Sequence, residues 1–466
     1  MDNEDDLFLN KEDLAPLIKK CENMLAHQKK VFFDVLEFID LLDFYIDNAK
    51  FDKALTIVNI ALHQHPYALE LEFRKAEIYI EQNNADEALA ILMRICKIEP
   101  ENADALFMIG VAHCIKGSFE NAIQMFDAYI DIEHDVEPEE SYYNVAVSLL
   151  NHNQYKYALH YLKKSYNLNQ HNALVVYDLA YCFEKTEEFS KSIQFYKEYI
   201  NLDPYSQIAW YNLGVIYTQC KKLKKAVRAF DFALAIDEFF SSALFNKANC
   251  LADLELYHDA INTYLEFLKC EPDSIIAHIY IAECYEKIKD FEQAEAYYSQ
   301  AIELDSECAE AWFGLGTIKF FVNEVRMALR YFEKTVEIEP HNEKYLTLYG
   351  MALYREQIVP AAIGAIKKAI KINQFNVDAW MCLAEIYMFE GKIDDAIKCL
   401  KQARKQSPHY KISYTLAAYC ANSQDVMRAK KYFSEAYTEN AEESDIFFDI
   451  CILEPNVLQE FRNIMF

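Results

Sequence analysis

Residues 207–240 read QIAWYNLGVIYTQCKKLKKAVRAFDFALAIDEFF and contain two apolar stripes with helical spacing. In the first stripe, Trp210, Leu213 and Tyr217 recur at i, i+3 and i+7, which places them on one face of a helix. In the second stripe, Ala226 and Phe230 lie four residues apart. A short polar connection separates the stripes, and a connection so short makes the two helices antiparallel. The stretch therefore predicts a helical hairpin.

A small residue recurs along the chain at the position of Ala226, in steps of 34 residues except for one step of 36. The series is Ala54, Ala88, Ala122, Ala158, Ser192, Ala226, Ala260, Ala294, Ala328, Ala362 and Ala396. Such a period over most of 466 residues indicates a stack of two-helix units rather than a globular enzyme with one pocket. We expect Gly214 and Ala226 to be small because the paired helices approach closely there. Trp210 and Phe230 are expected to fill the wider space toward neighbouring units.

The segment Trp210-Tyr211-Asn212-Leu213-Gly214, together with Tyr217, Ala226, Phe230 and Ala233, resembles the tetratricopeptide repeat. The resemblance implies an all-α fold, a right-handed superhelical solenoid of antiparallel helix pairs. We count twelve units, which begin near Val35, Leu69, Ala103, Glu139, Ala173, Gln207, Ser241, Ile275, Ala309, Glu343, Val377 and Lys411. The unit from Ala103 carries two extra residues around 135–138, and we expect local irregularity there without loss of the stack.

Both ends of a repeat stack need covers, because a terminal hairpin has no neighbour to bury its apolar face. We expect an acidic leader and an N-terminal capping helix in residues 1–34, with Asp13 capping a helix from Leu14 to about Gln28. Residues 35–443 are expected to form the twelve-unit solenoid. Residues 444–466 are expected to form a C-terminal half-repeat around Phe447 and a short capping helix around Phe461.

The composition of the chain excludes some classes of partner and indicates where the protein resides. The chain has 46 Lys+Arg against 74 Asp+Glu, a formal net charge of -28, so most of its surface repels a polyanion and we expect no nucleic acid partner. It has neither a basic leader nor an apolar run of membrane-spanning length, so we expect neither export nor membrane insertion. Its 13 cysteines form no CxxC pair, which suits free thiols in a reducing cytoplasm, and we expect a cytoplasmic protein.

No catalytic motif stands out. The eight glycines are dispersed and form no phosphate-binding loop, and the sequence contains neither HExxH nor GxSxG. The one close histidine pair, His63 and His65, lacks further ligands at metal-binding spacing and is interpreted as solvated. We therefore predict no catalytic, cofactor-binding or metal-binding residues, no cofactor, and a protein that is not an enzyme.

The resemblance implies that first helices line the concave side of the solenoid, with positions five and six of each unit pointing into it. In four successive units these positions hold Tyr143, Asn144, Tyr177, Asp178, Tyr211, Asn212, Phe245 and Asn246. Amide and carboxylate groups at regular steps can hydrogen-bond the backbone of an extended peptide, while aromatic rings supply contact area. This pattern is similar to the asparagine ladder by which some family members hold unstructured substrates. Alternatively, the asparagines only bond neighbouring helices.

One cationic cluster interrupts the acidic background. It consists of Lys221, Lys222, Lys224, Lys225 and Arg228, at the turn and the start of a second helix. Such a run is either a solvated face or a secondary contact for an acidic partner.

These observations favour a non-enzymatic interaction scaffold that binds a peptide segment or a helix of a protein partner on its concave face. The alternative is a structural subunit of a larger assembly that self-associates through its terminal helices, in which case the chain forms a homo-oligomer. An enzyme has little support, because the repeats leave no room for a catalytic domain.

Overall fold

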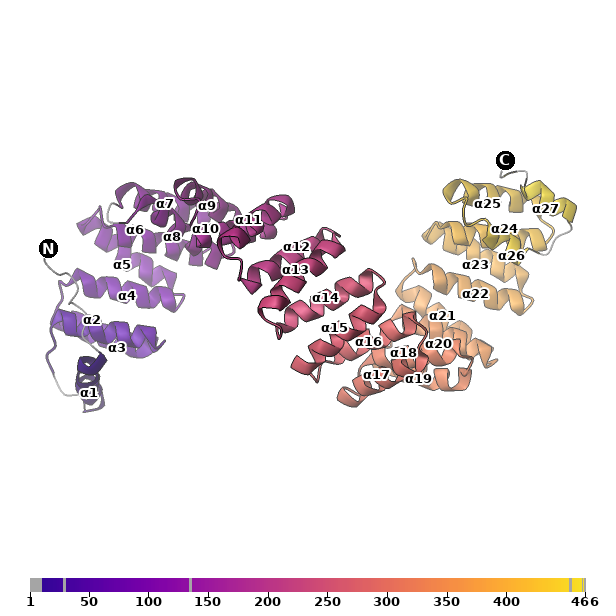
Figure 1. Cartoon of the computed structure of the whole chain (residues 1–466), viewed down its shortest axis with the longest axis horizontal. Helices are drawn as coiled ribbons and strands as arrows, with labels where there is room; N and C mark the ends of the chain where they lie inside the picture. Colours follow the sequence, from indigo (N-terminus) through magenta and orange to yellow (C-terminus); the bar gives the residue numbers. More distant parts are fainter. Residues whose placement is uncertain (1–10, 28–30, 134–135, 452–454, 463, 465–466) are drawn as a thin grey trace. The chain divides into compact units, whose positions relative to one another are not determined.

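The computed structural model describes residues 11–27, 31–133, 136–451, 455–462 and 464, and over these residues it contains α-helices and no strand. The chain divides into two compact units, Met1–Ile236 and Asp237–Phe466, which are taken separately below. Within each unit, consecutive helices pack as antiparallel pairs (Figure 1). The predicted fold class, an all-α superhelical array of helix pairs, is confirmed.

In the N-terminal unit the helices are α1 Lys11–His27, α2 Val35–Asp47, α3 Phe51–Gln64, α4 Leu69–Glu81, α5 Ala85–Ile98, α6 Ala103–Ile115, α7 Phe119–Ile132, α8 Pro138–Asn151, α9 Tyr155–Leu168, α10 Ala173–Lys185, α11 Phe189–Leu202, α12 Gln207–Gln219 and α13 Leu223–Ile236. In the C-terminal unit they are α14 Ser241–Asp253, α15 Tyr257–Cys270, α16 Ile275–Lys287, α17 Phe291–Leu304, α18 Ala309–Phe321, α19 Val325–Ile338, α20 Glu343–Arg355, α21 Val359–Ile372, α22 Val377–Phe389, α23 Ile393–Gln406, α24 Tyr410–Asn422, α25 Val426–Glu439, α26 Asp445–Ile450 and α27 Pro455–Arg462.

The even-numbered helices from α2 to α24 are the first helices of the repeats. All of them except α8 and α24 begin at the residue expected from the sequence. Helix α24 begins one residue early, at Tyr410, and α8 begins one residue early, at Pro138. Proline suits the first turn of a helix, because its missing N–H would have no partner there.

The two helices of a repeat are joined by a turn that contains one residue in the left-handed region. In the repeat of α12 and α13 this residue is Lys221, with φ 57°, and glycine takes the same place at Gly117, with φ 71°. The next amide returns to the helix end, where the Lys222 N–H donates to the Tyr217 carbonyl at 2.8 Å. This arrangement pairs carbonyls that would otherwise lack a partner at the end of the first helix.

In the pair of α12 and α13, a glycine on the first helix lies against an aromatic ring on the second. A Cβ atom added to Gly214 would stand 2.5 Å from Cε1 of Phe230, a side chain that is 0% exposed. Trp210 stacks on Phe232 of the same pair, with ring centroids 4.4 Å apart. Ala226 is buried as expected, and Gly214 leaves room for the Phe230 ring within the pair. The Trp210 indole N–H also donates to the Pro204 carbonyl, before the start of its repeat, at 3.0 Å. That Trp210 and Phe230 fill space toward neighbouring units stays a prediction.

The described residues at the ends pack onto the neighbouring repeats. Helix α1 begins three residues before the expected Leu14, and its Leu17 joins the core formed with α2 and α3. At the other end, Phe461 is fully buried, with its ring centroid 4.6 Å from that of Phe447 and 5.5 Å from that of Phe433. The leader at 1–10 and residue Gln28 lie outside the described residues. The division into 1–34, 35–443 and 444–466 stays a prediction.

Replacing Gly214 by alanine is expected to destabilise the protein by about 1–3 kcal/mol, because the new methyl group overlaps the Phe230 ring. Gly364, in the interior of α21, is the matched control, because nothing lies within 4 Å of an added Cβ atom there. Gly364→Ala is expected to stabilise the protein by about 0.5–1 kcal/mol through helix propensity. Urea unfolding followed by far-ultraviolet circular dichroism measures both changes, and shifts of the same sign would contradict this account of Gly214.

The turn geometry predicts that two further substitutions change the stability of the protein in opposite directions. Glu187 occupies the left-handed turn position with φ 62°, so Glu187→Gly is expected to raise stability by about 0.5–1 kcal/mol. Gly117→Ala places a side chain on the same turn position and is expected to lower stability by about 1 kcal/mol. Thermal unfolding midpoints of the two variants should therefore move in opposite directions. A lower midpoint for Glu187→Gly would show that the glutamate makes a stabilising contact of its own.

Candidate functional site

Six of the predicted binding residues lie on the first helices of three successive repeats in the N-terminal unit. They are Tyr143 and Asn144 on α8, Tyr177 and Asp178 on α10, and Tyr211 and Asn212 on α12. Two hydrogen bonds join them across repeats. The Tyr143 hydroxyl donates to Oδ2 of Asp178 at 3.0 Å, and Nδ2 of Asn212 donates to the Tyr177 hydroxyl at 3.0 Å. Position five of one repeat thus pairs with position six of the next.

This pairing engages part of the hydrogen-bonding capacity of the predicted ladder. Burial raises the pKa of the Asp178 carboxyl, and the hydrogen bond from Tyr143 partly opposes that shift. Burial also raises the pKa of Tyr143, so its hydroxyl keeps the proton that it donates. A primary amide has two N–H groups and an acceptor oxygen, and Asn212 uses one N–H toward Tyr177. Bonding between neighbouring helices therefore occurs, and it leaves capacity for a ligand.

The other two predicted residues, Phe245 and Asn246, lie on α14 and belong to the C-terminal unit. Nδ2 of Asn246 donates to the Ser242 carbonyl of its own helix at 2.9 Å. The Phe245 ring stacks on Tyr280 with centroids 5.8 Å apart. One N–H of the Asn246 amide is thus used by a backbone carbonyl of its own helix.

The cationic cluster is exposed at all five residues, Lys221, Lys222, Lys224, Lys225 and Arg228. Nζ of Lys225 lies 6.0 Å from the ring centroid of Tyr217. This geometry is typical of a solvated face, and a role in binding an acidic partner stays a prediction.

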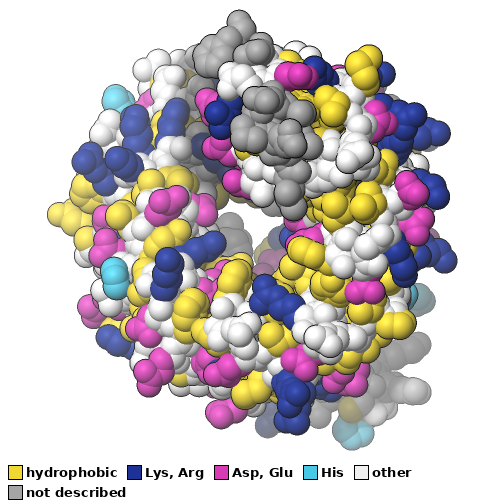
Figure 2. Space-filling model, turned by 90° about the vertical axis from the view of Figure 1, so that its right-hand side faces the viewer, with side chains coloured by type: hydrophobic (Ala, Val, Ile, Leu, Met, Phe, Trp, Pro, Cys, Tyr) yellow, Lys and Arg dark blue, Asp and Glu magenta, His cyan; other side chains and the backbone are white. Residues whose placement is uncertain are grey.

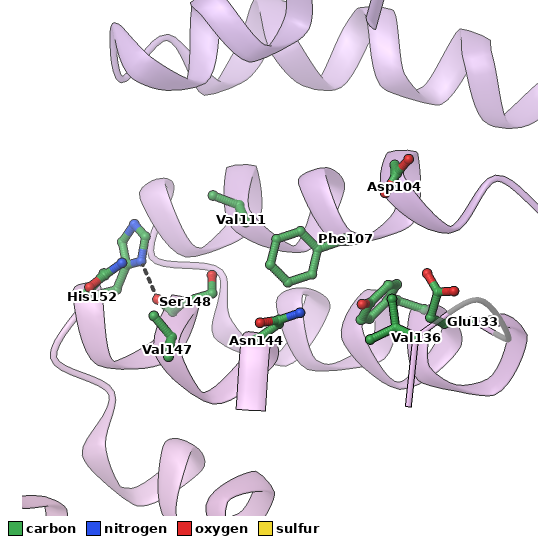
Figure 3. Close-up of a pocket in the computed structure, with 11 residues that line it drawn as sticks. Asp104, Phe107, Val111, Glu133, Val136, Asn144, Val147, Ser148 and His152 are labelled. Carbon is green, nitrogen blue, oxygen red and sulfur yellow. Dashed lines mark hydrogen bonds between the residues drawn. The ribbon is translucent and has the colours of Figure 1, made fainter. Parts of the chain in front are cut away.

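A pocket of about 490 Å³ opens where α6, α7 and α8 meet (Figure 3). We call it the junction pocket. It is lined by Asp104, Phe107, Val111, Tyr129, Glu133, Val136, Asn144, Val147, Ser148, Asn151 and His152. Of these residues, only Asn144 belongs to the set predicted from the sequence.

The junction pocket has apolar walls and polar ends. Phe107 and Val111 of α6 face Asn144 and Val147 of α8 across it (Figure 3). Phe107 is held by Tyr129, with ring centroids 5.2 Å apart. The side chains of Asp104 and Glu133 lie toward one end of the pocket (Figure 3).

The polar groups of the junction pocket have unused hydrogen-bonding capacity. Ser148 is 7% exposed, and its Oγ has no hydrogen-bond partner within the described part of the chain. Buried polar atoms rarely stay unpaired. Burial raises the pKa of the Tyr129 hydroxyl, and the neighbouring Asn144 partly opposes the shift. Nδ1 of His152 lies 2.8 Å from the Ser148 carbonyl oxygen, which fixes the ring at the end opposite the carboxylates.

The two extra residues of this repeat contribute to the junction pocket. The connection 133–137 between α7 and α8 is longer than the connection 169–172 between α9 and α10, and α8 is also longer than α10. Glu133 and Val136 come from this longer connection. The sequence showed the insertion, and that departure from the repeat was the available signal for a site here. Asp135 itself lies outside the described residues.

The described residues contain no group of three or more His, Cys, Asp or Glu arranged to hold a metal ion. Over the same residues, none of the helices combines the length and the apolar composition needed to cross a membrane. The 13 cysteines, all within the described residues, form no disulfide bond.

Comparison with known proteins identifies the repeat. Tetratricopeptide repeat family models match residues 72–102, 174–206, 208–240, 275–308 and 377–410. Hsp70-Hsp90 organizing protein 3 of Arabidopsis thaliana is 27% identical over 118 residues, which are 25% of this chain and 21% of that protein. Anaphase-promoting complex subunit 3 of Schizosaccharomyces pombe is 23% identical over 226 residues, which are 47% of this chain and 34% of that protein. The chain thus spans a fifth to a third of the length of these relatives.

Among solved structures, a tetratricopeptide repeat protein from Parabacteroides merdae aligns with a TM-score of 0.41 and 15% identity, over 63% of this chain and 98% of that one. YrrB, a tetratricopeptide repeat protein with an unusual peptide-binding site, aligns with a TM-score of 0.36 and 19% identity, over 42% of this chain and 97% of that one. The helix pairs and the family matches agree that the chain contains tetratricopeptide repeats.

Proposed function

We propose that the chain is a non-enzymatic scaffold that binds a peptide segment of a protein partner along the face of α6, α8, α10 and α12. The junction pocket anchors an apolar side chain of that segment. The pocket is the observation that carries the proposal, because it combines apolar walls with polar groups on the face predicted to bind. Its volume of about 490 Å³ lies within the ~300–1,000 Å³ typical of ligand sites.

The apolar walls supply binding free energy. Phe107, Val111 and Val147 line the space that a leucine or phenylalanine side chain would enter. Full burial of such a side chain contributes about 1.5–3 kcal/mol. One anchor of this size does not offset the entropy cost of ordering a peptide, so contacts along several repeats have to add to it.

The polar groups orient the backbone of a bound peptide. Asn144 and Asn151 each offer an amide to the backbone of a bound peptide, and Oγ of Ser148 offers a hydroxyl. Further along the face, the amide oxygen of Asn212 remains an acceptor beyond the hydrogen bonds of its amide to the Tyr177 and Tyr196 hydroxyls. These groups are spaced along one row of first helices, as an extended segment requires.

The bonds between repeats stiffen this row. Tyr143 with Asp178 joins α8 to α10, and Tyr177 with Asn212 joins α10 to α12. A face whose side chains are already oriented loses less conformational entropy on binding. In this proposal the predicted ladder residues mainly position the face, and the junction pocket makes the anchoring contact.

Self-association through the terminal helices is not favoured by a specific observation. Phe461, the central apolar residue of α27, is fully buried against Phe447 and Phe433 of its own unit. The assembly role of the chain stays a prediction.

Val147→Lys tests the anchor, and Val227→Lys is its matched control. Both valines are half-buried in the N-terminal unit, but Val147 lines the junction pocket, whereas Val227 lies on the second helix α13, outside the proposed binding face. Val147→Lys is expected to weaken binding about tenfold or more, because the lysine fills the pocket with a charged side chain. Val227→Lys should stay within about twofold of the unmodified protein.

Peptides selected from a random twelve-residue library on the unmodified full chain are the ligands, and fluorescence anisotropy measures their affinities. Circular dichroism should show the same helicity and melting in both variants. Equal affinities of the two lysine variants would refute the anchor. Failure of the library to yield any binder would refute the peptide-binding function itself.

A further inference from the structure

The C-terminal unit contains a second pocket on its own first-helix face, with a volume of about 380 Å³. It lies among α14, α15 and α16, and we call it the tyrosine pocket. Its lining residues combine aromatic rings with carboxylates: Asn249, Ala252, Asp253, Tyr257, Tyr264, Tyr280, Glu283, Cys284 and Lys287.

The aromatic rings of the tyrosine pocket are held in place by packing. The ring centroids of Tyr264 and Tyr280 are 6.0 Å apart and tilted by 57°, and the Phe245 ring lies 5.9 Å from Tyr264 and 5.8 Å from Tyr280. The Tyr264 hydroxyl donates to Oδ1 of Asn249. That bond fixes the asparagine amide, whose nitrogen remains a donor. Tyr257 adds a third half-buried ring to the lining.

The carboxylates of the tyrosine pocket are incompletely compensated. Asp253 and Glu283 both line the pocket, and neither forms an ion pair with a lysine or arginine in the described part of the chain. Partial desolvation of the Glu283 carboxyl in the pocket raises its pKa, Lys287 one helical turn further on lowers it, and Glu310 raises it, so the net shift is upward. The site therefore places negative charge beside aromatic rings.

We infer that the tyrosine pocket binds the guanidinium group of an arginine side chain from a protein partner. A cation over a tyrosine face is attracted by the ring quadrupole, and arginine also stacks on such a face through its planar group. The N–H groups of a guanidinium donate to carboxylates in a fixed fork, which suits Asp253 and Glu283 at the rim of one pocket. A neutral or anionic side chain would leave both carboxylates without a partner.

Charge over the rest of the surface does not supply this recognition. On the face shown in Figure 2, Lys and Arg side chains lie among Asp, Glu and apolar side chains. A net charge of -28 attracts any cationic peptide weakly and is screened by salt. If binding is specific, it depends on the carboxylates of the tyrosine pocket and not on carboxylates elsewhere on the surface. The experiment compares one carboxylate of each kind.

The probe is a short fluorescein-labelled peptide of glycine and serine with two arginines, and its partner probe has citrulline in place of both arginines. Citrulline keeps the size of arginine and removes its charge. At physiological ionic strength the full chain is expected to bind the arginine peptide about tenfold more tightly than the citrulline peptide. Glu283→Gln is expected to remove most of that preference, and Tyr280→Leu is expected to reduce it by removing the π face.

Glu292→Gln is the matched control, since it makes the same change of charge on the exposed side of α17, outside the tyrosine pocket. It should keep the arginine preference within about twofold. Equal losses in Glu283→Gln and Glu292→Gln would overturn the inference, as would equal affinities for the two peptides or no measurable binding of the arginine peptide.

The inference extends the proposed function by naming a residue of the partner, and it rests on that function only in requiring a protein partner. The tests are separable because Val147 belongs to the other unit and is probed with different peptides. If the junction pocket fails its test and the arginine preference depends on Glu283, the tyrosine pocket stands as a binding site by itself.

Discussion

The repeats depend on one steric constraint, the close approach of the two helices of each pair at a glycine or alanine. On the first helix of several repeats this residue is glycine, and sixteen residues later the second helix presents a large buried side chain. An added Cβ atom would stand 2.5 Å from Phe230 at Gly214 and 2.6 Å from Phe332 at Gly316. The contact recurs at Gly110 and Gly350, so four pairs approach closely at the same position of the repeat.

Much of the fold could be predicted because this constraint is local. A period of 34 residues, read from single alanines such as Ala226, was enough to place the start of nearly every first helix. The contacts that Trp210 and Phe230 make within their own pair could not be predicted in the same way. Periodicity assigns a residue to the buried side of its helix, but it does not say whether the partner lies in the same repeat or in the next one.

The candidate site, too, could be predicted from the sequence only in part. The face that carries Tyr143, Tyr177 and Asn212 follows from helical periodicity. The bonds that these side chains make to one another do not follow from it, since they depend on the distance between repeats. The junction pocket was not predicted from the sequence, for a different reason. It includes Glu133 and Val136 from the connection that carries the two extra residues. From the sequence, we expected only local irregularity of the repeat there and not a site.

A double-mutant cycle between Gly214 and Phe230 tests the central constraint most directly. The unfolding free energies of Gly214→Ala, Phe230→Leu and the double variant are compared with that of the unmodified chain. If the methyl group is harmful only because the ring is there, Gly214→Ala should cost little once Phe230 is leucine. The coupling energy should then be about 1–2 kcal/mol. Additive effects of the two substitutions would contradict the account.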